Sequence, residues 1–442
     1  MLRQRNTCLL APLSLTVLGL LSLLGTGGQL PAQESVSLTD TGGFGQSKEV
    51  DLGDAVALEQ PEWFKSVTFQ LTAHENQDEV SNSSADQKEE TQATKSVGDA
   101  EILGDRFGLL YRLKNRERSQ WSLKPRFSGW TSIGYHDQNN GLFNNHAHGV
   151  NLHQLWMTIE SDSSVGQGDG DSDPTIGYRA DVVYGVDGPD TQAFGNPTGT
   201  WDYQNNWGNG KNGWAMPQLY LHGQVGRLNY KLGHFYTPVG YETVTAPDNF
   251  FYSHAQTMVN SEPFTHTGVL TEFSTENDST VYLGWSLGWD SGFAQSENGS
   301  NGIVGISKNL TEEIAMTYVT TFGDLGWRGE GYSHSIVLDL ALTENLSYIL
   351  QSDYVNTSSL FDAGDDIGLN NYLIYYVDDC LSLGTRLEWW RDNSVSKNSF
   401  TVGANWRPGK GLFLLRPEVR SDWIPAENYS ETAFGIDAII EF

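Results

Sequence analysis

Strands of alternating polarity, long enough to cross a membrane, are the feature of this sequence that most constrains its fold. Residues 281–290 alternate apolar side chains with tyrosine, glycine, serine and aspartate, and residues 432–442 show a similar alternation. A period of two places successive side chains on opposite faces of a strand. Strands in soluble proteins run about five or six residues, whereas a tilted strand that spans a bilayer needs about nine to eleven. The pattern therefore predicts membrane-spanning strands.

Sixteen segments of this kind follow one another from about residue 126 to the end of the chain. The fold class they predict is all-β: a transmembrane antiparallel β-barrel of about 16 strands within residues 106–442. An even strand number places both ends of the barrel on the periplasmic side. The predicted segments are 126–136, 150–160, 175–186, 214–225, 228–236, 263–274, 279–290, 301–307, 312–322, 332–341, 345–355, 369–377, 381–392, 398–406, 411–423 and 432–442.

The connections between these segments alternate in length from the fourth segment on, as expected for short periplasmic turns and longer external loops. Residues 225–228 and 377–381 form tight links, whereas 237–262 and 356–368 are long. The link 161–174 departs from this rule, because it is long for a periplasmic turn. The alternation is independent of the polarity pattern and favours the same barrel.

The first 105 residues differ from the predicted barrel. Arg3 and Arg5 precede an apolar run over Leu9–Leu24, so residues 1–32 are expected to be a signal peptide that directs export. Residues 33–105 contain 16 acidic and 4 basic residues. Such a segment buries too little apolar surface to fold alone, which predicts a flexible periplasmic extension.

The charge of the chain excludes one large class of functions. Lysine and arginine total 26 against 55 aspartate and glutamate, which gives a formal net charge of −29. A chain this acidic does not bind nucleic acid through a basic surface. Residues 106–442 carry 39 acidic and 20 basic residues, so a pore within them is expected to favour cations weakly.

Aromatic residues mark the predicted membrane boundaries. Tryptophans at the ends of segments suit the interface girdles of membrane proteins. Phe442 ends the chain, and Ile440 and Ala438 precede it on the same face of the last segment. This ending resembles the signal by which the assembly machinery recognises outer-membrane barrels. The tryptophans expected in the girdles are Trp130, Trp156, Trp214, Trp289, Trp389, Trp406 and Trp423.

Five short motifs occur in order in the middle of the chain. They are Gln218–Tyr220, Lys231–Phe235, Gly240–Glu242, Asn249–Ser253 and Thr265–Val269. The set resembles the OmpL-like porins, a family of outer-membrane β-barrel porins of Gram-negative-type bacteria, over about residues 126–442. The resemblance implies passive diffusion of small hydrophilic solutes or ions across a bacterial outer membrane. It brings no catalytic residues and leaves the solute open.

The connection 237–262 is the third external loop of the predicted barrel. In general porins with sixteen strands the third loop folds inward and narrows the pore, and this loop is similar in position and in carrying acidic but no basic residues. The alternative is an external loop that closes over its own aromatic side chains. The pore constriction is predicted to be formed by acidic residues of the loop and basic residues of the wall, namely Glu242, Asp248, Glu262, Arg386, Arg420 and Arg179.

Further charged side chains fall on the polar face of their segments. They are expected to face the lumen, because a charge at the centre of the lipid face costs about 2–4 kcal/mol. Opposite signs at alternate positions also allow neighbouring strands to neutralise one another. The predicted lumen-facing residues are Glu388, Arg416, Glu418, Asp422 and Asp181.

Three other functions are compatible with such a barrel. Tryptophans in a glycine- and asparagine-rich loop, such as Trp201 and Trp207, suit a substrate-specific sugar channel. A plug formed by residues 33–105 would suit a surface receptor or adhesin. A barrel-embedded hydrolase would use Ser286 of the Gly284–Gly288 sequence, but that serine lies within a predicted strand rather than at the sharp turn which the motif needs.

Metal ligands and cofactors are not expected. His146, His148 and His153 straddle a loop, and residues 169–173 resemble a calcium loop that lacks its glycine and its final glutamate. The expected partners are outer-membrane lipid, small hydrophilic solutes or ions, the barrel-assembly machinery and, by analogy with general porins, further copies in a homotrimer.

Overall fold

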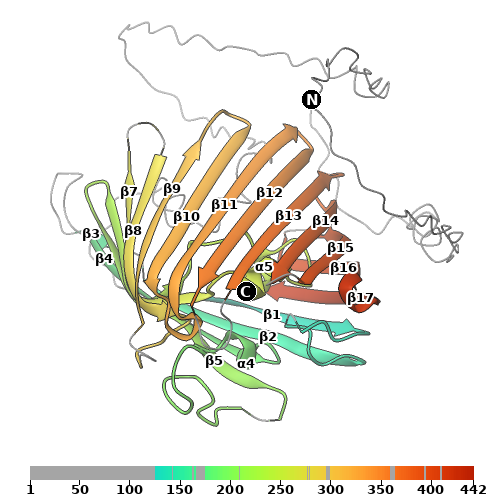
Figure 1. Cartoon of the computed structure of the whole chain (residues 1–442), viewed down its shortest axis with the longest axis horizontal. Helices are drawn as coiled ribbons and strands as arrows, with labels where there is room; N and C mark the ends of the chain where they lie inside the picture. Colours follow the sequence, from blue (N-terminus) through green and yellow to red (C-terminus); the bar gives the residue numbers. More distant parts are fainter. Residues whose placement is uncertain are drawn as a thin grey trace, which may run out of the picture. The chain divides into compact units, whose positions relative to one another are not determined.

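The computed structural model describes residues 125–442, apart from residues 142, 162–163, 166–174, 209, 276, 278, 295–298, 359–363, 393–394 and 409–410. Within these residues, sixteen antiparallel strands follow one another in sequence order and close into a barrel (Figure 1). The first strand, β1 (Arg126–His136), pairs with the last, β17 (Tyr429–Glu441). Each of these described strands therefore has a neighbour on both sides, and their backbone polar groups bond to one another instead of facing lipid.

The strands have lengths suited to a bilayer, from nine residues in β6 to fourteen in β11. A short extra strand, β3 (Ser164–Val165), pairs only with β4 and belongs to the long connection after β2. Between β1 and β17 the barrel strands are β2 (Gly149–Glu160), β4 (Thr175–Gly185), β5 (Gly213–Val225), β6 (Leu228–Tyr236), β7 (Thr265–Ser274), β8 (Ser279–Trp289), β9 (Ser300–Asn309), β10 (Ile314–Asp324), β11 (Glu330–Thr343), β12 (Leu346–Thr357), β13 (Gly364–Tyr376), β14 (Leu381–Asp392), β15 (Val395–Trp406) and β16 (Phe413–Ile424).

The sixteen predicted segments correspond one to one to these sixteen strands, so the predicted barrel is confirmed. The bounds of β1, β6 and β14 are those predicted, and most other ends differ by one to three residues. The start of β13 differs most, because it lies at Gly364 instead of residue 369. Asp365 and Asp366 follow that glycine and conceal the polarity pattern at this end of the strand.

Successive side chains point alternately to the lipid and to the interior. On β8, Leu283 and Trp285 are 54% and 45% exposed, whereas Tyr282 and Ser286 are 1% and 0% exposed. This is the alternation that the sequence predicts for the segment. The lipid-facing residues are apolar, and the inward-facing series carries the glycines and polar residues.

The girdle predicted from seven tryptophans is only partly right. Trp156 and Trp289 are buried, and Trp130 stacks on Trp156 with ring centroids 4.7 Å apart. Trp130 donates a hydrogen bond to the inward-facing Gln154, and Trp289 donates one to Thr321. A position near the end of a strand sets the height of a side chain in the membrane, but not the face on which it lies. The outward-facing tryptophans of the seven are Trp214, Trp389, Trp406 and Trp423.

The predicted signal peptide, residues 1–32, and the predicted extension, residues 33–105, lie outside the described residues, as does most of the calcium-like sequence at 169–173. The boundaries of these segments therefore stay predictions. Among the described residues, no helix is long and apolar enough to cross a membrane.

The lipid-facing position of Leu283, in the middle of β8, generates a direct test. Leu283→Arg is expected to lower the free energy of unfolding by about 2–4 kcal/mol, because a charge near the centre of the bilayer is costly. The matched control Leu283→Phe keeps the face apolar. Urea titration of both variants in lipid vesicles measures the difference, and equal stabilities would mean that Leu283 does not face lipid.

Candidate functional site

The connection between β6 and β7, residues 237–264, lies inside the barrel and is named the inward loop below. It contains the short helices η2 (Ala246–Asp248) and α5 (Gln256–Asn260; Figure 1) and has no other regular structure. An irregular segment cannot pair its backbone groups in a ladder, so these groups need partners elsewhere. The barrel wall supplies many of them.

Arg386 of β14 is the central attachment of the inward loop. Its side chain is 0% exposed, and its Nη1 donates to Oε1 of Glu242 in the loop at 2.6 Å. Its Nε donates to Oε1 of Glu388, on the same strand, at 2.7 Å. The guanidinium also donates to the backbone oxygen of Ser253 at 2.8 Å and to its hydroxyl at 3.0 Å. One buried cation thus joins the wall to two points of the loop.

Arg420 of β16 lies beside this group. Its Nη1 donates to Oε1 of Glu388 at 2.8 Å and to the backbone oxygen of His254 at 3.1 Å. Its Nε donates to Asp422 at 2.9 Å, and its Nη2 donates to the hydroxyl of Ser399 at 2.8 Å. The carboxylate of Glu388 therefore lies between two arginines, and the second arginine holds the loop through a backbone group.

Arg416, also on β16, binds the middle of the loop. It donates two hydrogen bonds to Asp437, at 2.9 and 2.7 Å, in a bidentate pair. Its Nη1 donates to the backbone oxygens of Ala246, Asn249 and Phe251 at 2.6, 2.7 and 3.1 Å. This single side chain provides a hydrogen-bond donor to three carbonyl groups of a loop whose only regular structure is two short helices.

Carboxylates of the wall bind the amide groups of the same loop. Glu418 accepts hydrogen bonds from the backbone N–H groups of Tyr252 and Ser253 at 2.9 and 3.1 Å. Glu388 accepts one from the backbone N–H of Gln256 at 2.7 Å. Carboxylates of the wall thus accept hydrogen bonds from N–H groups of the loop, and arginines of the wall donate hydrogen bonds to its C=O groups. The wall therefore provides partners for both the donors and the acceptors of the loop backbone.

Glycines on the inward face let the aromatic side chains of the loop approach the wall. A Cβ atom at Gly384 would lie 2.4 Å from the ring of Phe250, and one at Gly435 would lie 2.8 Å from the ring of Tyr252. Both distances are shorter than a non-bonded contact allows. The loop therefore packs on bare backbone at these two points.

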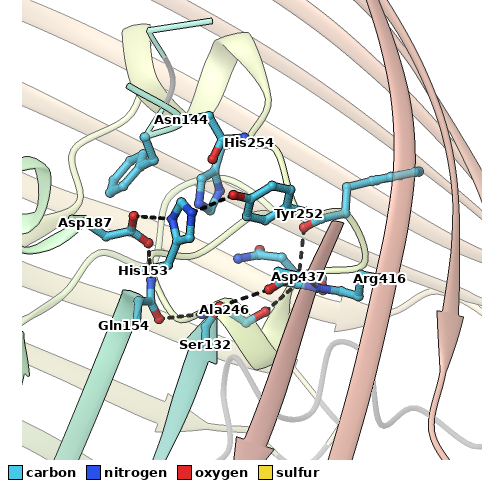
Figure 2. A pocket seen from close by; sticks show the side chains of 13 residues that line it. Ser132, Asn144, His153, Gln154, Asp187, Ala246, Tyr252, His254, Arg416 and Asp437 are labelled. Carbon is cyan, nitrogen blue, oxygen red and sulfur yellow. Dashed lines mark hydrogen bonds and ion pairs between the residues drawn. The ribbon is translucent and has the colours of Figure 1, made fainter. Parts of the chain in front are cut away.

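Tyr252 connects the inward loop to β1 and β2 (Figure 2). Its hydroxyl lies 2.5 Å from Nε2 of His153 and 3.1 Å from Nδ1 of His136. The other ring nitrogen of His153 lies 2.8 Å from a carboxylate oxygen of Asp187. A β-bulge in β2 directs both His153 and Gln154 inward. The sequence of β2 does not reveal this bulge. The contacts of Tyr252 with His153 and His136 were therefore not predicted from the sequence.

Apolar contacts also hold the loop. Val244, Met258 and Phe264 pack against side chains that β2, β4 and β5 direct inward. The loop is thus fixed by ionic groups on β14–β17 and by apolar contacts on the opposite side. The apolar partners on the wall are Trp156, Val183 and Ala215.

The charge state of Glu242 depends on two opposing effects. Burial alone would raise the pKa of Glu242, but the Arg386 guanidinium, together with His254, outweighs burial and holds the pKa well below its usual range. The carboxylate is therefore ionised at neutral pH, and its attraction to Arg386 is present there.

Arg179 belongs to a different group on the wall formed by β2, β4, β6 and β7. Its side chain is 24% exposed, lies 3.6 Å from Glu160 and bonds to Asp181 at 2.9 Å. Lys231 pairs with Glu272 at 3.3 Å, with its side chain 20% exposed. The structure therefore does not bring Arg179 together with the arginines of β14 and β16.

The other predicted site residues lie in three places. Asp248 is exposed in η2 and accepts a hydrogen bond from Thr245, whereas Glu262 is buried and accepts one from Gln351. Asp422 keeps 18% of its side chain exposed. The predicted assembly residues lie at the periplasmic end of β17, where Phe442 and Ile440 are 62% and 54% exposed and Ala438 lies on the same outward face.

A metal site or a catalytic centre would need reactive side chains grouped together among the described residues. These contain no cluster of three or more histidine, cysteine, aspartate or glutamate side chains suited to a metal. Ser286 is 0% exposed within β8, with His266 Nδ1 3.2 Å from its hydroxyl. The second ring nitrogen of His266 lies 3.0 Å from the hydroxyl of Thr237 instead of a carboxylate. This arrangement lacks both the exposed turn and the acid of a hydrolase triad.

The closed barrel and its inward loop define an outer-membrane channel of the porin type. The family model described as "Putative beta-barrel porin-2, OmpL-like" matches residues 124–442. The chain therefore belongs to this family of outer-membrane porins. No curated protein sequence is significantly similar to it.

Solved structures share the fold at low sequence identity. The outer membrane channel DcaP of Acinetobacter baumannii matches with a TM-score of 0.51 and 9% identity, over 74% of this chain and 100% of that chain. OmpT, an outer membrane protein of Vibrio cholerae, matches with a TM-score of 0.48 and 10% identity, over 72% of this chain and 99% of that chain. An anion-selective porin from Comamonas acidovorans matches with a TM-score of 0.47 and 9% identity, over 72% of this chain and 99% of that chain. The likeness to DcaP supports the fold alone.

Removing the central cation should release the inward loop. Arg386→Met leaves Glu242 and Glu388 buried with fewer counter-charges, and we expect it to lower the free energy of unfolding by about 3–5 kcal/mol. Arg391→Met is the matched control, because Arg391 lies on the same strand but is exposed on the outer face, beside the ring of Trp389. Urea titration in vesicles and proteolysis within residues 237–264 measure both effects. Equal loop protection in the two variants would contradict the anchoring role.

The lowered pKa of Glu242 gives this attachment a defined pH dependence. The carboxylate contributes stability above the ordinary glutamate pKa of about 4.3 and loses it as the pH falls toward the lower value in the folded state. Glu242→Gln should therefore be most destabilising at pH 7, and the difference from wild type should shrink at pH 3. Urea midpoints at both pH values measure this, and a pH-independent difference would exclude the ionic attachment.

Proposed function

We propose that this protein is an outer-membrane porin through which small hydrophilic solutes diffuse passively, without enzymatic activity. The observation that carries the proposal is an irregular loop fastened inside a closed barrel of sixteen described strands. A barrel of this size encloses more space than its own side chains fill. A loop held within that space narrows the passage and sets its selectivity.

We propose further that the constriction lies between the inward loop and the wall that carries Arg179. Of the six residues predicted for it, Asp248 is exposed and Arg179 is partly exposed, which suits contact with passing solutes. The remaining four are buried and would set the position of the loop. These four are Glu242, Glu262, Arg386 and Arg420.

A weak preference for cations is the selectivity that the charges favour. The side chains of Arg386, Arg416 and Arg420 are at most 3% exposed, and each is paired with a carboxylate. Two more accessible cations of the barrel wall, Arg179 and Lys231, are also paired. Exposed carboxylates of the acidic chain would then dominate the field that a solute meets.

Single-channel conductance in a planar bilayer tests the function. Wild-type protein should give stable conductance steps and a reversal potential on the cation-selective side under a KCl gradient. Asp248→Lys should lower the cation-to-anion permeability ratio about two- to fivefold, because a positive charge at the constriction repels cations. Glu427→Lys makes the same charge change in the exposed external connection after β16 and should alter the ratio less.

The other outcomes separate the rival functions. Anion selectivity of the wild type would overturn the preference for cations, and silence from correctly folded protein would overturn the open channel in favour of a plugged receptor or adhesin. Saturable conductance block by a sugar would instead support a substrate-specific channel, for which the 50% exposed Trp207 is the best-placed aromatic residue.

The proposed porin function also implies three partners, which are membrane lipid, the barrel-assembly machinery and further copies of the chain. Lipid contacts the outward-facing apolar residues of the strands, and the exposed end of β17 at Phe442 is available to the barrel-assembly machinery. A homotrimer is the assembly we propose by analogy with general porins, to be measured by the mass of the protein in detergent.

A further inference from the structure

A groove of about 420 Å³ lies on the lipid-facing side of β4–β7. Tyr178 and Leu221 line it from β4 and β5, and Leu232 lines it from β6. Gly233 and Gly268 face each other across β6 and β7, at neighbouring positions of the two strands. Both glycines belong to the inward-facing series of their strands, since a Cβ atom at Gly233 would lie against the inward-facing Tyr220, so it is their backbone that lines the groove.

The external end of the groove is bounded by chain that follows β8. Phe293 lines the groove, is 51% exposed and packs on Trp201 with ring centroids 4.9 Å apart. Thr267 of β7 donates a hydrogen bond to the backbone oxygen of Ser291 at 2.6 Å. Since Thr267 and Phe293 line the same groove, the external loops descend here onto the outer wall.

Three buried polar atoms beside this end have no hydrogen-bond partner among the described residues. They are Nε1 of Trp201, Nδ2 of Asn196 and Nε2 of His234. The Thr267 hydroxyl donates to a backbone oxygen, so it accepts from the His234 Nδ1–H group 2.8 Å away, and Nε2 of His234 is an acceptor. The cluster thus offers two donors and one acceptor, next to a groove that is otherwise apolar.

We propose that this groove binds one acyl chain of a membrane lipid from the external leaflet. The groove is continuous with the lipid-facing wall of the barrel, and its volume falls within the range of about 300–1,000 Å³ that is typical of ligand sites. Apolar lining suits the chain, and its external end lies where the polar part of a lipid begins. The ester carbonyl groups of the lipid then lie toward Nε1 of Trp201 and Nδ2 of Asn196, whose N–H groups can donate to them.

A substitution that fills the groove from its floor gives the decisive variant. Ala180 lines the groove on β4, opposite Leu219 on β5. Ala180→Trp occupies the space without adding charge to the lipid face. The matched control is Ala404→Trp, because Ala404 lies opposite the exposed Leu383 on the outward face of β14 and β15, far along the barrel from the groove.

Native mass spectrometry of the full chain, purified in detergent and incubated with vesicles of phosphatidylethanolamine, tests the proposal. Wild type and Ala404→Trp should retain one lipid molecule per chain at detergent concentrations that remove the others. Ala180→Trp should reduce the retained fraction about tenfold, which corresponds to about 1.4 kcal/mol. Trp201→Phe keeps an aromatic ring but removes the indole N–H group, and we expect it to reduce retention about threefold.

Each alternative outcome overturns the proposal. Equal lipid retention in wild type and Ala180→Trp would exclude the groove as the site. Loss of an oligomer in Ala180→Trp, with no change in bound lipid, would assign the groove to contact with a second copy. If Ala180→Trp does not fold, as judged by its electrophoretic mobility without heating, Leu221→Trp fills the same groove from β5 and serves in its place.

Discussion

Closure of β1 onto β17 is the constraint on which the rest of the structure depends. The hydrocarbon interior of a membrane offers no hydrogen-bond partner to a backbone amide, so an open edge would leave a whole strand unsatisfied. The pairing that closes the barrel, with Trp130 opposite Glu441 and Gly134 opposite Asp437, also fixes which residues point inward. A shift of one residue would direct Asp437 to lipid and remove the partner of Arg416.

The inward loop is stabilised by the wall rather than by its own conformation. Its backbone bonds to arginine and glutamate side chains of β14 and β16, which occupy alternate positions on strands and are therefore held rigidly. Burying charges is costly, and a well-packed apolar contact often stabilises a protein as much as a buried ion pair does. The ionic contacts differ in being directional, because a guanidinium such as Arg416 bonds only where several carbonyl groups converge. We infer that they fix the position of the loop more than they add to its stability.

The sequence predicted the strands because their signal is local. Alternation along one strand requires no knowledge of its neighbour, and the identity of the third external loop follows from counting strands. Contacts between distant parts of the barrel could not be predicted from the sequence, because they depend on how neighbouring strands are staggered and on β-bulges. The bulge at His153, for example, brings that residue to Tyr252, 99 positions away. The predicted tryptophan girdle was only partly right for the same reason, since Trp156 and Trp289 lie on the inward face. The inward glycines were visible in the sequence, yet only the folded loop explains why Gly384 and Gly435 bear no side chain.

The distribution of charge in the barrel depends on burial as much as on number. A count of basic residues on the strands suggests a positively charged wall, but the arginines that produce this impression lie under the inward loop and contact carboxylates directly. Arg386 and Arg420 share Glu388, so one acidic residue serves two cations, and Glu242 and Asp422 complete the balance. A group neutralised in this way exerts little field at a distance in water, where screening is strong beyond about 8–10 Å. Whatever selectivity the pore has is therefore set by the few charged side chains that keep contact with solvent.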